Sequence, residues 1–184
     1  MTDKSVARKM LEIELKVRVN SLDPIRQNLE NRHAEFRGKQ HEHDIYYNAP
    51  HRDFGSTDEA LRVRYTDSHA LVTYKGKKLR EYGLKAREEL NTAVESGEVF
   101  EQILARLGFT KTAEVNKWRE NYRLGNTSFA LDLVDGLGTF VEIEIIAQND
   151  DADATNQIQR YAKEMGICGE PILASYLELI QSTR

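Results

Sequence analysis

The stretch MLEIELKVRV, residues 10–19, alternates strictly between apolar and charged side chains after its first residue. Such alternation predicts a β-strand, because successive side chains of a strand point to opposite faces of the sheet. One face would carry the apolar residues Leu11, Ile13, Leu15, Val17 and Val19. The other would carry the charged residues Glu12, Glu14, Lys16 and Arg18. We therefore expect one face to pack on a core and the other to place two carboxylates beside two cations.

The composition is typical of one globular domain. A chain of 184 residues, 40% of them hydrophobic, is long enough for a sizeable core, and we treat residues 1–184 as a single domain. Charged residues make up 30%, and the formal net charge of −4 argues against nonspecific nucleic-acid binding. The single cysteine, Cys168, excludes an internal disulfide framework. No apolar run reaches the roughly 20 residues of a membrane span, so we expect a cytoplasmic protein without membrane contact.

Eight strands and several helices are predicted from periodicity and turn residues. A helix should begin after Ser21, which is a plausible N-cap, and end at Gly38. Further helices are expected over about 92–108 and 152–166, with a last short one in ILASYLELI. Besides residues 10–19, the expected strands are HEHDIYYNA, ALRVRY, ALVTYKG, GLKAREEL, VNKWRENYRL, TSFALDLVDG and GTFVEIEII.

The polar faces of these strands carry full charges, although strands disfavour Glu and Lys. Two antiparallel arrangements would accommodate such faces. In one, an open sheet exposes its charged face to water. In the other, the sheet closes into a barrel with apolar residues outside, under helices, and a wet, charged interior; closure also removes exposed edges. Composition alone does not separate the two.

A closed barrel lined by cations must pair them or bind a polyanion, because unpaired buried charges cost several kcal/mol each. Arg presents a planar fork to phosphate oxygens, and Lys a point charge. The number of aligned cations suits a ligand with several phosphates better than one with a single carboxylate. These cations are Arg62, Arg64, Lys75, Arg87, Lys117 and Arg119.

The acidic side chains of the same faces predict a metal site. Glu12 and Glu14 share one strand face, and Glu142 and Glu144 share another, with Asp132 on the neighbouring arm of a hairpin. Carboxylates are the hard oxygen ligands that Mg²⁺ or Mn²⁺ takes, and substrate phosphates would complete the coordination. A metal and cations around a polyphosphate form the recurring arrangement for phosphoryl or nucleotidyl transfer.

With these residues identified, the chain resembles the CYTH superfamily, the triphosphate tunnel metalloenzymes, over about residues 10–180. The family hallmark ExExK matches Glu12, Glu14 and Lys16. Further pieces follow in family order: HDIYYNAPHRDFGSTDEALRVR, TYKG, REE, KWRENY, LDLVDGLGTFVEIE and SYLELI. The resemblance implies an α+β fold, an eight-stranded antiparallel closed tunnel barrel with helices outside.

The resemblance also implies roles for the charged residues. Glu12 and Glu14 would bind the metal with Glu142 or Glu144, near Asp132, and Lys16 would lie at the reacting end. Arg62, Arg64, Lys75, Lys117 and Arg119 would bind the triphosphate, and Arg87 with Glu89 would line the same tunnel. A homodimer is implied by resemblance only.

Three functions remain open. The piece RDFGSTDEALRVR looks most like class IV adenylyl cyclases, which convert ATP to cyclic AMP and pyrophosphate. The alternative is hydrolysis of inorganic tripolyphosphate or an organic, thiamine-type triphosphate, which Glu144 favours because some cyclases of the family lack an acid there. A binding protein without catalysis is the third, and the complete set of acids argues against it.

Overall fold

Alternating residues form ten strands in the computed structural model, which describes residues 10–67, 69–81, 84–148 and 152–182. All the strand pairings are antiparallel. The strands are β1 (Met10–Arg18), β2 (Glu35–Asn48), β3 (Ala60–Tyr65), β4 (Ala70–Lys75), β5 (Leu79–Glu81), β6 (Leu84–Arg87), β7 (Glu89–Val94), β8 (Thr110–Leu124), β9 (Thr127–Val134) and β10 (Gly138–Gln148).

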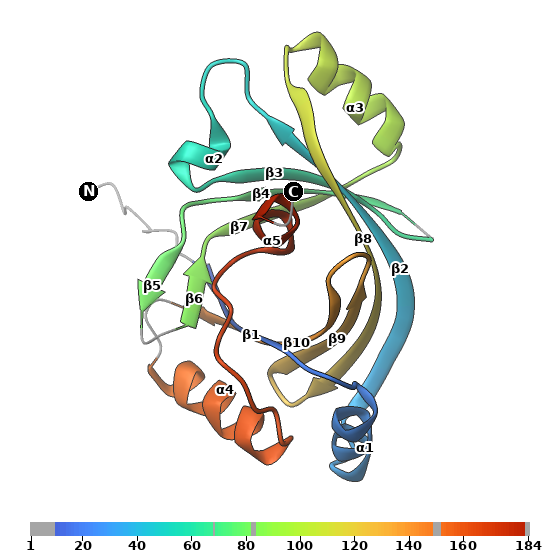
Figure 1. Cartoon of the computed structure of the whole chain (residues 1–184). Helices are drawn as coiled ribbons and strands as arrows, with labels where there is room; N and C mark the ends of the chain where they lie inside the picture. The colour runs from blue at the N-terminus through green and yellow to red at the C-terminus, as the bar shows by residue number, and fades with distance from the viewer. Residues whose placement is uncertain (1–9, 68, 82–83, 149–151, 183–184) are drawn as a thin grey trace, which may run out of the picture.

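The sheet curls into a nearly closed barrel (Figure 1). Its strand order is β5-β6-β1-β10-β9-β8-β2-β3-β4-β7. Only Glu88 separates β6, which pairs with β1, from β7, which pairs with β4. The Glu88 carbonyl accepts a 2.9 Å hydrogen bond from the Gly76 backbone N–H. Residues 84–94 therefore lie between the two sides of the sheet. With β6 and β7 as separate strands, the nearly closed ring has nine strands, one more than the predicted eight, and the three-residue β5 is an addition to it.

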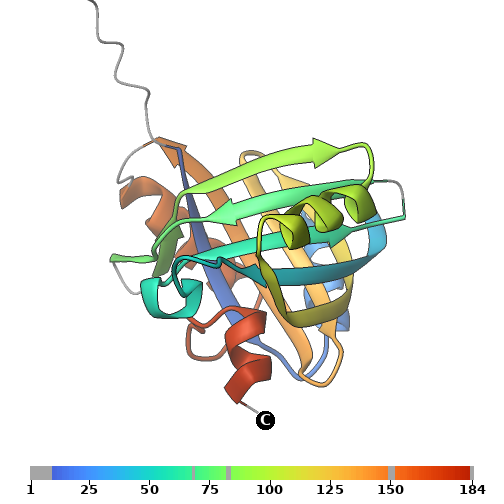
Figure 2. The same ribbon diagram turned by 90° about the horizontal axis from the view of Figure 1, so that it is seen from above.

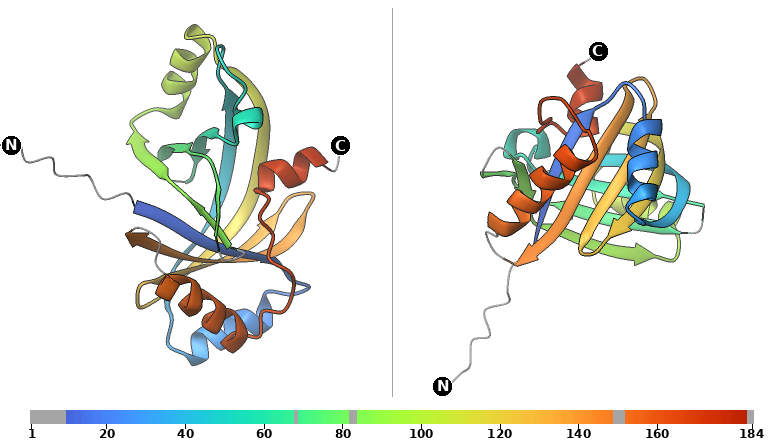
Figure 3. Two further views of the ribbon diagram at one scale, coloured as in Figure 1. Left: turned by 90° about the vertical axis from the view of Figure 1, so that its left-hand side faces the viewer. Right: turned by 90° about the horizontal axis from the view of Figure 1, so that it is seen from below.

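Helices cover the outside of the barrel. Figure 3 shows α1 (Asp23–Asn31) and α4 (Ala152–Glu164) side by side beneath β1, β9 and β10. Figure 2 shows α3 (Gly97–Arg106) lying across the outer surface of the strands on another side. The short α2 (Phe54–Thr57) follows β2, and α5 (Tyr176–Ser182) lies over one end of the barrel. No helix of the described residues is long and apolar enough to cross a membrane.

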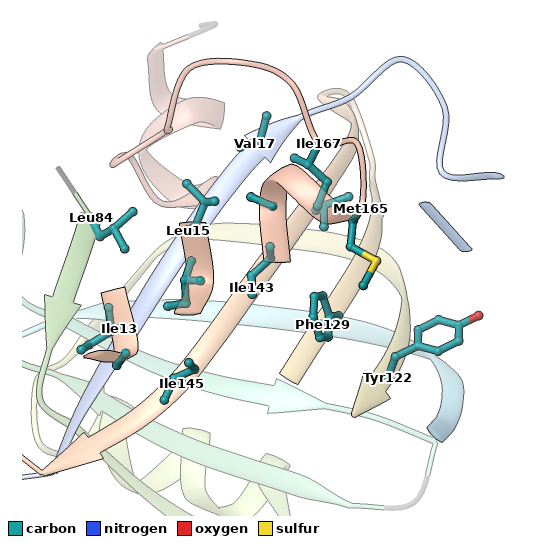
Figure 4. Packing of buried hydrophobic residues seen from close by; sticks show 14 of the residues in the cluster. Ile13, Leu15, Val17, Leu84, Tyr122, Phe129, Ile143, Ile145, Met165 and Ile167 are labelled. Carbon is teal, nitrogen blue, oxygen red and sulfur yellow. The ribbon is translucent and has the colours of Figure 1, made fainter. Parts of the chain in front are cut away.

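The apolar face of β1 makes the main core, as predicted. Its side chains pack with the outward faces of β9 and β10, between these strands and the helices α1 and α4 (Figure 4). Full burial of a Leu or Ile side chain stabilises the fold by about 1.5–3 kcal/mol. The buried members of this core include Ile13, Leu15, Val17, Phe129, Leu131, Ile143, Ile158 and Met165. The core therefore lies outside the barrel and leaves the interior to the charged residues.

The first helix ends earlier than the predicted stop at Gly38. α1 ends at Asn31, and His33 adopts a left-handed backbone with φ of 56°. The chain then enters β2, where the Phe36 ring contacts the Tyr122 ring of β8 in a tilted arrangement, with 5.1 Å between the ring centroids. Gly38, with φ of 118°, lies at an irregularity in the β2–β8 pairing. Cross-strand pairing thus overrides the helical spacing of Phe36, and the glycine serves a β-bulge.

The second predicted helix is also shorter. The range of about 92–108 begins inside β7, which continues to Val94, and α3 starts at Gly97. Ser96 caps α3 by accepting a 3.2 Å hydrogen bond from the Val99 backbone N–H. Two predicted strands are too short at their N-terminal ends. β2 begins at Glu35, six residues before the predicted strand 41–49, and β8 begins at Thr110, five residues before the predicted strand 115–124.

Candidate active site inside the barrel

The charged faces of the strands turn inward around a cavity of about 230 Å³. This tunnel cavity brings together eleven of the twelve predicted site residues. They are Glu12, Glu14, Lys16, Arg62, Arg64, Lys75, Arg87, Lys117, Arg119, Glu142 and Glu144. Asp132, the twelfth, is fully buried behind this lining. Closure of the sheet therefore converts the alternating strands into one charged wall.

Pairing between β1 and β10 builds the acidic end of the cavity. Lys16 lies opposite Glu142, and Glu14 opposite Glu144, in the strand register. The Lys16 ammonium contacts Glu14 at 3.1 Å and Glu142 at 3.2 Å. Burial lowers the pKa of Lys16, but these two carboxylates raise it more, so the pKa lies above its ordinary value. Lys16 is therefore a fixed positive charge among acids.

The acids of this end repel one another. Burial, followed by repulsion from Glu12, Glu14 and Glu142, raises the pKa of Glu144 to about 8. A carboxyl group in such surroundings binds a proton or a cation more readily than an ordinary one. The crowding of these acids therefore favours the binding of a further cation, in addition to Lys16, at this end of the cavity.

The same residues fit a divalent metal by charge and by donor chemistry. Within the described part of the chain, no group of three or more acidic, His or Cys side chains is already arranged to hold a metal ion. The four glutamates nevertheless offer hard oxygen donors of the kind Mg²⁺ and Mn²⁺ prefer. A divalent ion would also relieve the repulsion that raises the pKa of Glu144. Its ligands would come from Glu12, Glu14, Glu142 and Glu144.

Two carboxylates of β2, Glu42 and Asp44, face the interior in addition to the predicted residues. Asp44 contacts Arg64 at 2.6 Å to Nε and 2.7 Å to Nη2. Glu42 contacts Arg64 Nη1 at 2.8 Å and Lys117 Nζ at 2.9 Å. β2 is thus an acidic strand between β3 and β8, whose facing residues are cations.

These ion pairs change the pKa values on both sides. Burial raises the pKa of Glu42, but Arg119, Lys117 and Arg64 lower it more, to about 2. Burial likewise raises the pKa of Asp44, yet Arg62 and the neighbouring cations hold it well below its ordinary value. The pKa of Lys117 is lowered by burial and by repulsion from nearby guanidinium groups. Both carboxylates are therefore ionised at neutral pH.

Asp132 holds Arg119 in place. Arg119 donates to both Asp132 oxygens, at 2.7 Å from Nε and 2.5 Å from Nη2, and also pairs with Glu142. The Tyr176 hydroxyl of α5 donates to Asp132 at 2.8 Å. The Tyr176 ring lies beneath the Lys16 ammonium, 4.3 Å from its centroid. The structure therefore places Asp132 next to the predicted acid cluster as a partner of Arg119.

The remaining predicted cations are held on the β4–β6–β7 side. Lys75 pairs with Glu89, which lies opposite it in the register. Arg87 donates to the Gly76 carbonyl at 2.9 Å and to the Asp58 carbonyl at 3.1 Å. Arg87 thus both lines the cavity and ties β6 to the chain segments beside it.

A second cavity of about 200 Å³ adjoins the first and shares Tyr46, Ala60, Arg87 and Ser175 with it. Its other walls come from α2, α5 and the segments near them, including the buried Phe54. The charged tunnel cavity therefore adjoins a second cavity whose walls include aromatic and apolar side chains.

Sequence reasoning missed Glu42, Asp44 and Tyr176 for different reasons. The signal for the two acids was present, since they alternate with His41 and His43 on a predicted strand. Tyr176 gave no such signal, because it belongs to a short helix whose position over the barrel depends on tertiary packing. Neither strand alternation nor spacing could place that helix.

Comparison with known proteins agrees with this fold. A family model described as the CYTH domain matches residues 10–176. A protein of Methanocaldococcus jannaschii named "Putative adenylate cyclase" is 36% identical over 173 residues, covering 92% of this chain and 98% of the relative. A solved structure from Pyrococcus horikoshii is 34% identical, with a TM-score of 0.81, covering 94% of this chain and 99% of that one.

A structure from Hippeastrum shares the fold at lower identity. It superposes with a TM-score of 0.70 at 18% identity, covering 95% of this chain and 96% of that one. A dominant triphosphatase activity is described for that plant protein. At this identity the likeness extends to the fold alone.

Proposed function

Because the chain belongs to the CYTH domain family, we propose that it is a divalent-metal-dependent enzyme that acts on a triphosphate substrate inside its tunnel, and that its reaction is the cyclisation of ATP to cyclic AMP and pyrophosphate. The observation that carries the proposal is the lining of one cavity by seven cations and four clustered glutamates. The M. jannaschii relative, named as an adenylate cyclase, supports the choice of reaction.

The cationic wall is suited to a chain of phosphates. Its six Arg and Lys side chains besides Lys16 come from β3, β4, β6 and β8, so they surround the cavity from several sides. The buried Arg62 Nε has no hydrogen-bond partner among the described residues, although the side chain lines the cavity. A buried donor without an acceptor is costly, and a phosphate oxygen would satisfy it.

The metal would be Mg²⁺ or Mn²⁺, held by Glu12, Glu14, Glu142 and Glu144. When bound, it would neutralise phosphate charge and polarise the phosphorus that is attacked. Lys16, fixed beside Glu14 and Glu142, would stabilise the negative charge that develops on the reacting phosphate. Asp132 would act through Arg119, whose guanidinium it orients.

In the cyclase reaction, the ribose 3′-hydroxyl oxygen attacks the α-phosphorus. The bond from that phosphorus to the oxygen bridging the α- and β-phosphates breaks, pyrophosphate leaves, and the hydroxyl proton passes to a base. The tunnel cavity of about 230 Å³ is smaller than the roughly 300–1,000 Å³ of sites for whole organic ligands. The triphosphate would fill it, and the nucleoside would extend into the adjoining cavity of about 200 Å³.

The second candidate is a triphosphatase. Here water attacks the terminal phosphorus, and the bond from that phosphorus to its bridging oxygen breaks. Orthophosphate and the remaining diphosphate are released, and the proton of the attacking water passes to solvent. Two observations favour it: the acidic Glu144 lies in the cavity wall, and the cavity has the size of a polyphosphate group rather than of a whole nucleotide. The fold also supports this activity in the Hippeastrum protein.

Product identification separates the candidates. Purified protein is incubated with Mn²⁺ or Mg²⁺ and, separately, with ATP or inorganic tripolyphosphate. Cyclic AMP with pyrophosphate is the expected result. Orthophosphate without cyclic AMP, accompanied by ADP from ATP and by pyrophosphate from tripolyphosphate, would replace the cyclase with the triphosphatase. Saturable binding without any product would reduce the protein to a polyphosphate-binding protein, and neither binding nor turnover would contradict the proposal as a whole.

A pair of lysine variants tests whether any activity belongs to the tunnel. Lys75→Gln removes a cation that lines the cavity and pairs with Glu89. Lys39→Gln removes a cation on the outer surface, where it contacts Glu120. Activity should fall in the first variant and stay at the wild-type level in the second. Equal activities would indicate a contaminating enzyme or another site.

A further inference from the structure

Glu42 and Asp44 have no role in the proposed reaction, yet they are among the most buried acids of the protein. Their exposed fractions are 2% and 1%. Neither belongs to the glutamate cluster at the acidic end. Both contact the cations assigned to the triphosphate, and Asp44 itself lines the tunnel cavity. Their position therefore calls for an explanation in terms of those cations.

The two carboxylates occupy donors that a phosphate would use. Asp44 accepts two hydrogen bonds from Arg64 and lies 3.4 Å from Arg62 and 3.7 Å from Lys117. Glu42 contacts Arg64 and Lys117 at 2.8 and 2.9 Å and lies 3.9 Å from Arg119. A guanidinium fork binds a carboxylate and a phosphate through the same geometry. An incoming phosphate must therefore compete with these carboxylates.

We propose that Asp44 and Glu42 are tethered counter-anions that occupy the phosphate-binding cations of the free protein and thereby weaken polyphosphate binding, which allows substrate and product to leave the tunnel. The inference rests on the proposed function of the same cavity. It adds two affinity-setting residues to that site and assigns them no chemical step.

The charge balance at this position leaves room for a ligand. Among the described residues, the ion pairs of Arg62, Arg64 and Lys117 are with these two carboxylates. Arg119 is instead held mainly by Asp132 and Glu142. Three cations against two anions leave a net positive charge. A purely structural pair would offset buried charge without affecting ligand affinity. A competing pair would weaken the binding of a polyanion, and this difference can be measured.

The test is calorimetric titration of inorganic tripolyphosphate into the full-length protein in EDTA, where no metal-dependent turnover occurs. Asp44→Asn and Glu42→Gln remove one negative charge each with little change in shape. Each should lower the Kd for tripolyphosphate by about tenfold, because one competing charge is lost next to the ligand. The salt dependence of binding should become steeper at the same time.

Glu120→Gln is the matched control. Glu120 is also a buried acid, but it pairs with Arg26 and Lys39 on the outside of the barrel. The Glu120→Gln substitution changes the net charge by the same amount but lies outside the tunnel, so the Kd for tripolyphosphate should stay near the wild-type value. An affinity in both tunnel variants equal to or weaker than that of the control would overturn the inference and leave Asp44 and Glu42 as structural counter-ions.

The folding of the variants is part of the same test. Loss of the Asp44 charge leaves the neighbouring cations to repel one another, so Asp44→Asn should have a lower melting temperature than the wild type in the absence of ligand. Tripolyphosphate should raise the melting temperature of this variant by more than it raises that of the wild type. A variant that stays unfolded at saturating tripolyphosphate also overturns the inference, because the anion should replace the lost carboxylate. Failure of the wild-type protein to bind tripolyphosphate would instead contradict the proposed function, and this inference with it.

Discussion

Glu12 and its neighbours show how the barrel changes the behaviour of single residues. On an isolated strand, these acids would be ordinary solvated carboxylates. Inside the barrel, burial and mutual repulsion raise the pKa of Glu144 to about 8, with Glu12 the first contributor among its neighbours. The site therefore stores like-charge repulsion in the absence of metal. Removing one acid should relieve that repulsion and, at the same time, remove a proposed ligand.

Glu12→Gln should abolish turnover without unfolding the protein. Loss of a ligand to a catalytic metal removes several kcal/mol of transition-state stabilisation, so the rate should fall at least about 100-fold. The melting temperature should stay the same or rise, since one repulsive charge is removed. The measurements are turnover at saturating Mn²⁺ and thermal unfolding. Wild-type activity would remove Glu12 from the metal site, and an unfolded variant would show that its role is structural.

At the scale of elements, the packing of α3 against the barrel requires a glycine at one position. The helix is capped by Ser96 and held by Glu101, which accepts hydrogen bonds from the hydroxyl groups of Tyr47 and Tyr65. Its first residue, Gly97, lies directly against the Tyr65 ring. A Cβ atom added to Gly97 would lie 2.4 Å from that ring.

Gly97→Ala should destabilise the protein, although alanine is the better helix former by about 1 kcal/mol. The added methyl group must push α3 or Tyr65 away, and overpacking of this kind costs about 1–3 kcal/mol. Urea unfolding measures the difference. Gly55→Ala in α2 is the control, because its Cβ would meet only ordinary contacts, the nearest at 3.5 Å from Asp53. A Gly97→Ala variant as stable as the control would contradict this account of the docking.

The strands were predictable because alternation is a direct consequence of strand geometry. The inward-facing charged residues of β1, β3, β8 and β10 follow from a period of two along each strand. The end of α1 was not predictable, since Leu29 and Phe36 keep helical spacing while Phe36 belongs to β2. The pairing of Phe36 with Tyr122 brings together residues far apart in the chain, which local periodicity does not reveal.

The candidate site was predictable to the same extent as the strands. Residue type and alternation located the cavity lining, but they did not say which charges pair. Asp132 lay on a predicted inward face, yet Arg119 and Tyr176 enclose it. Its role depends on α5, whose position no local signal determines. Closure of the barrel itself came from the family resemblance, because composition left an open sheet equally possible.

At the scale of the whole molecule, the buried ion pairs make stability depend on pH. Glu42 has a pKa of about 2 in the folded protein, whereas an unfolded glutamate has one of about 4.3. The unfolded state therefore takes up the proton first on acidification. The stabilisation from this pair is complete above the unfolded pKa and is lost as the pH falls toward 2. Asp44, whose pKa is also lowered, acts in the same direction.

The free energy of unfolding should fall steeply between about pH 4.3 and pH 2 in the wild-type protein, and less steeply in Glu42→Gln. The variant keeps a neutral side chain over this range, so it has no proton to take up at that position. Urea unfolding at several pH values measures the two slopes, with Glu30→Gln on the exposed side of α1 as the control. Equal slopes in the wild type and Glu42→Gln would contradict the depressed pKa.

The pairing of β1 with β10 has a consequence for how the protein is made. Residues 10–18 find their partners at residues 140–148, so the strand synthesised first waits for one of the last. Until then, its edge is exposed and its charged face remains in water. Contacts of such sequence separation slow folding and lengthen the exposure to aggregation. A chain that ends before residue 138 lacks all of β10 and therefore one wall of the tunnel, although it already contains most of the charged residues.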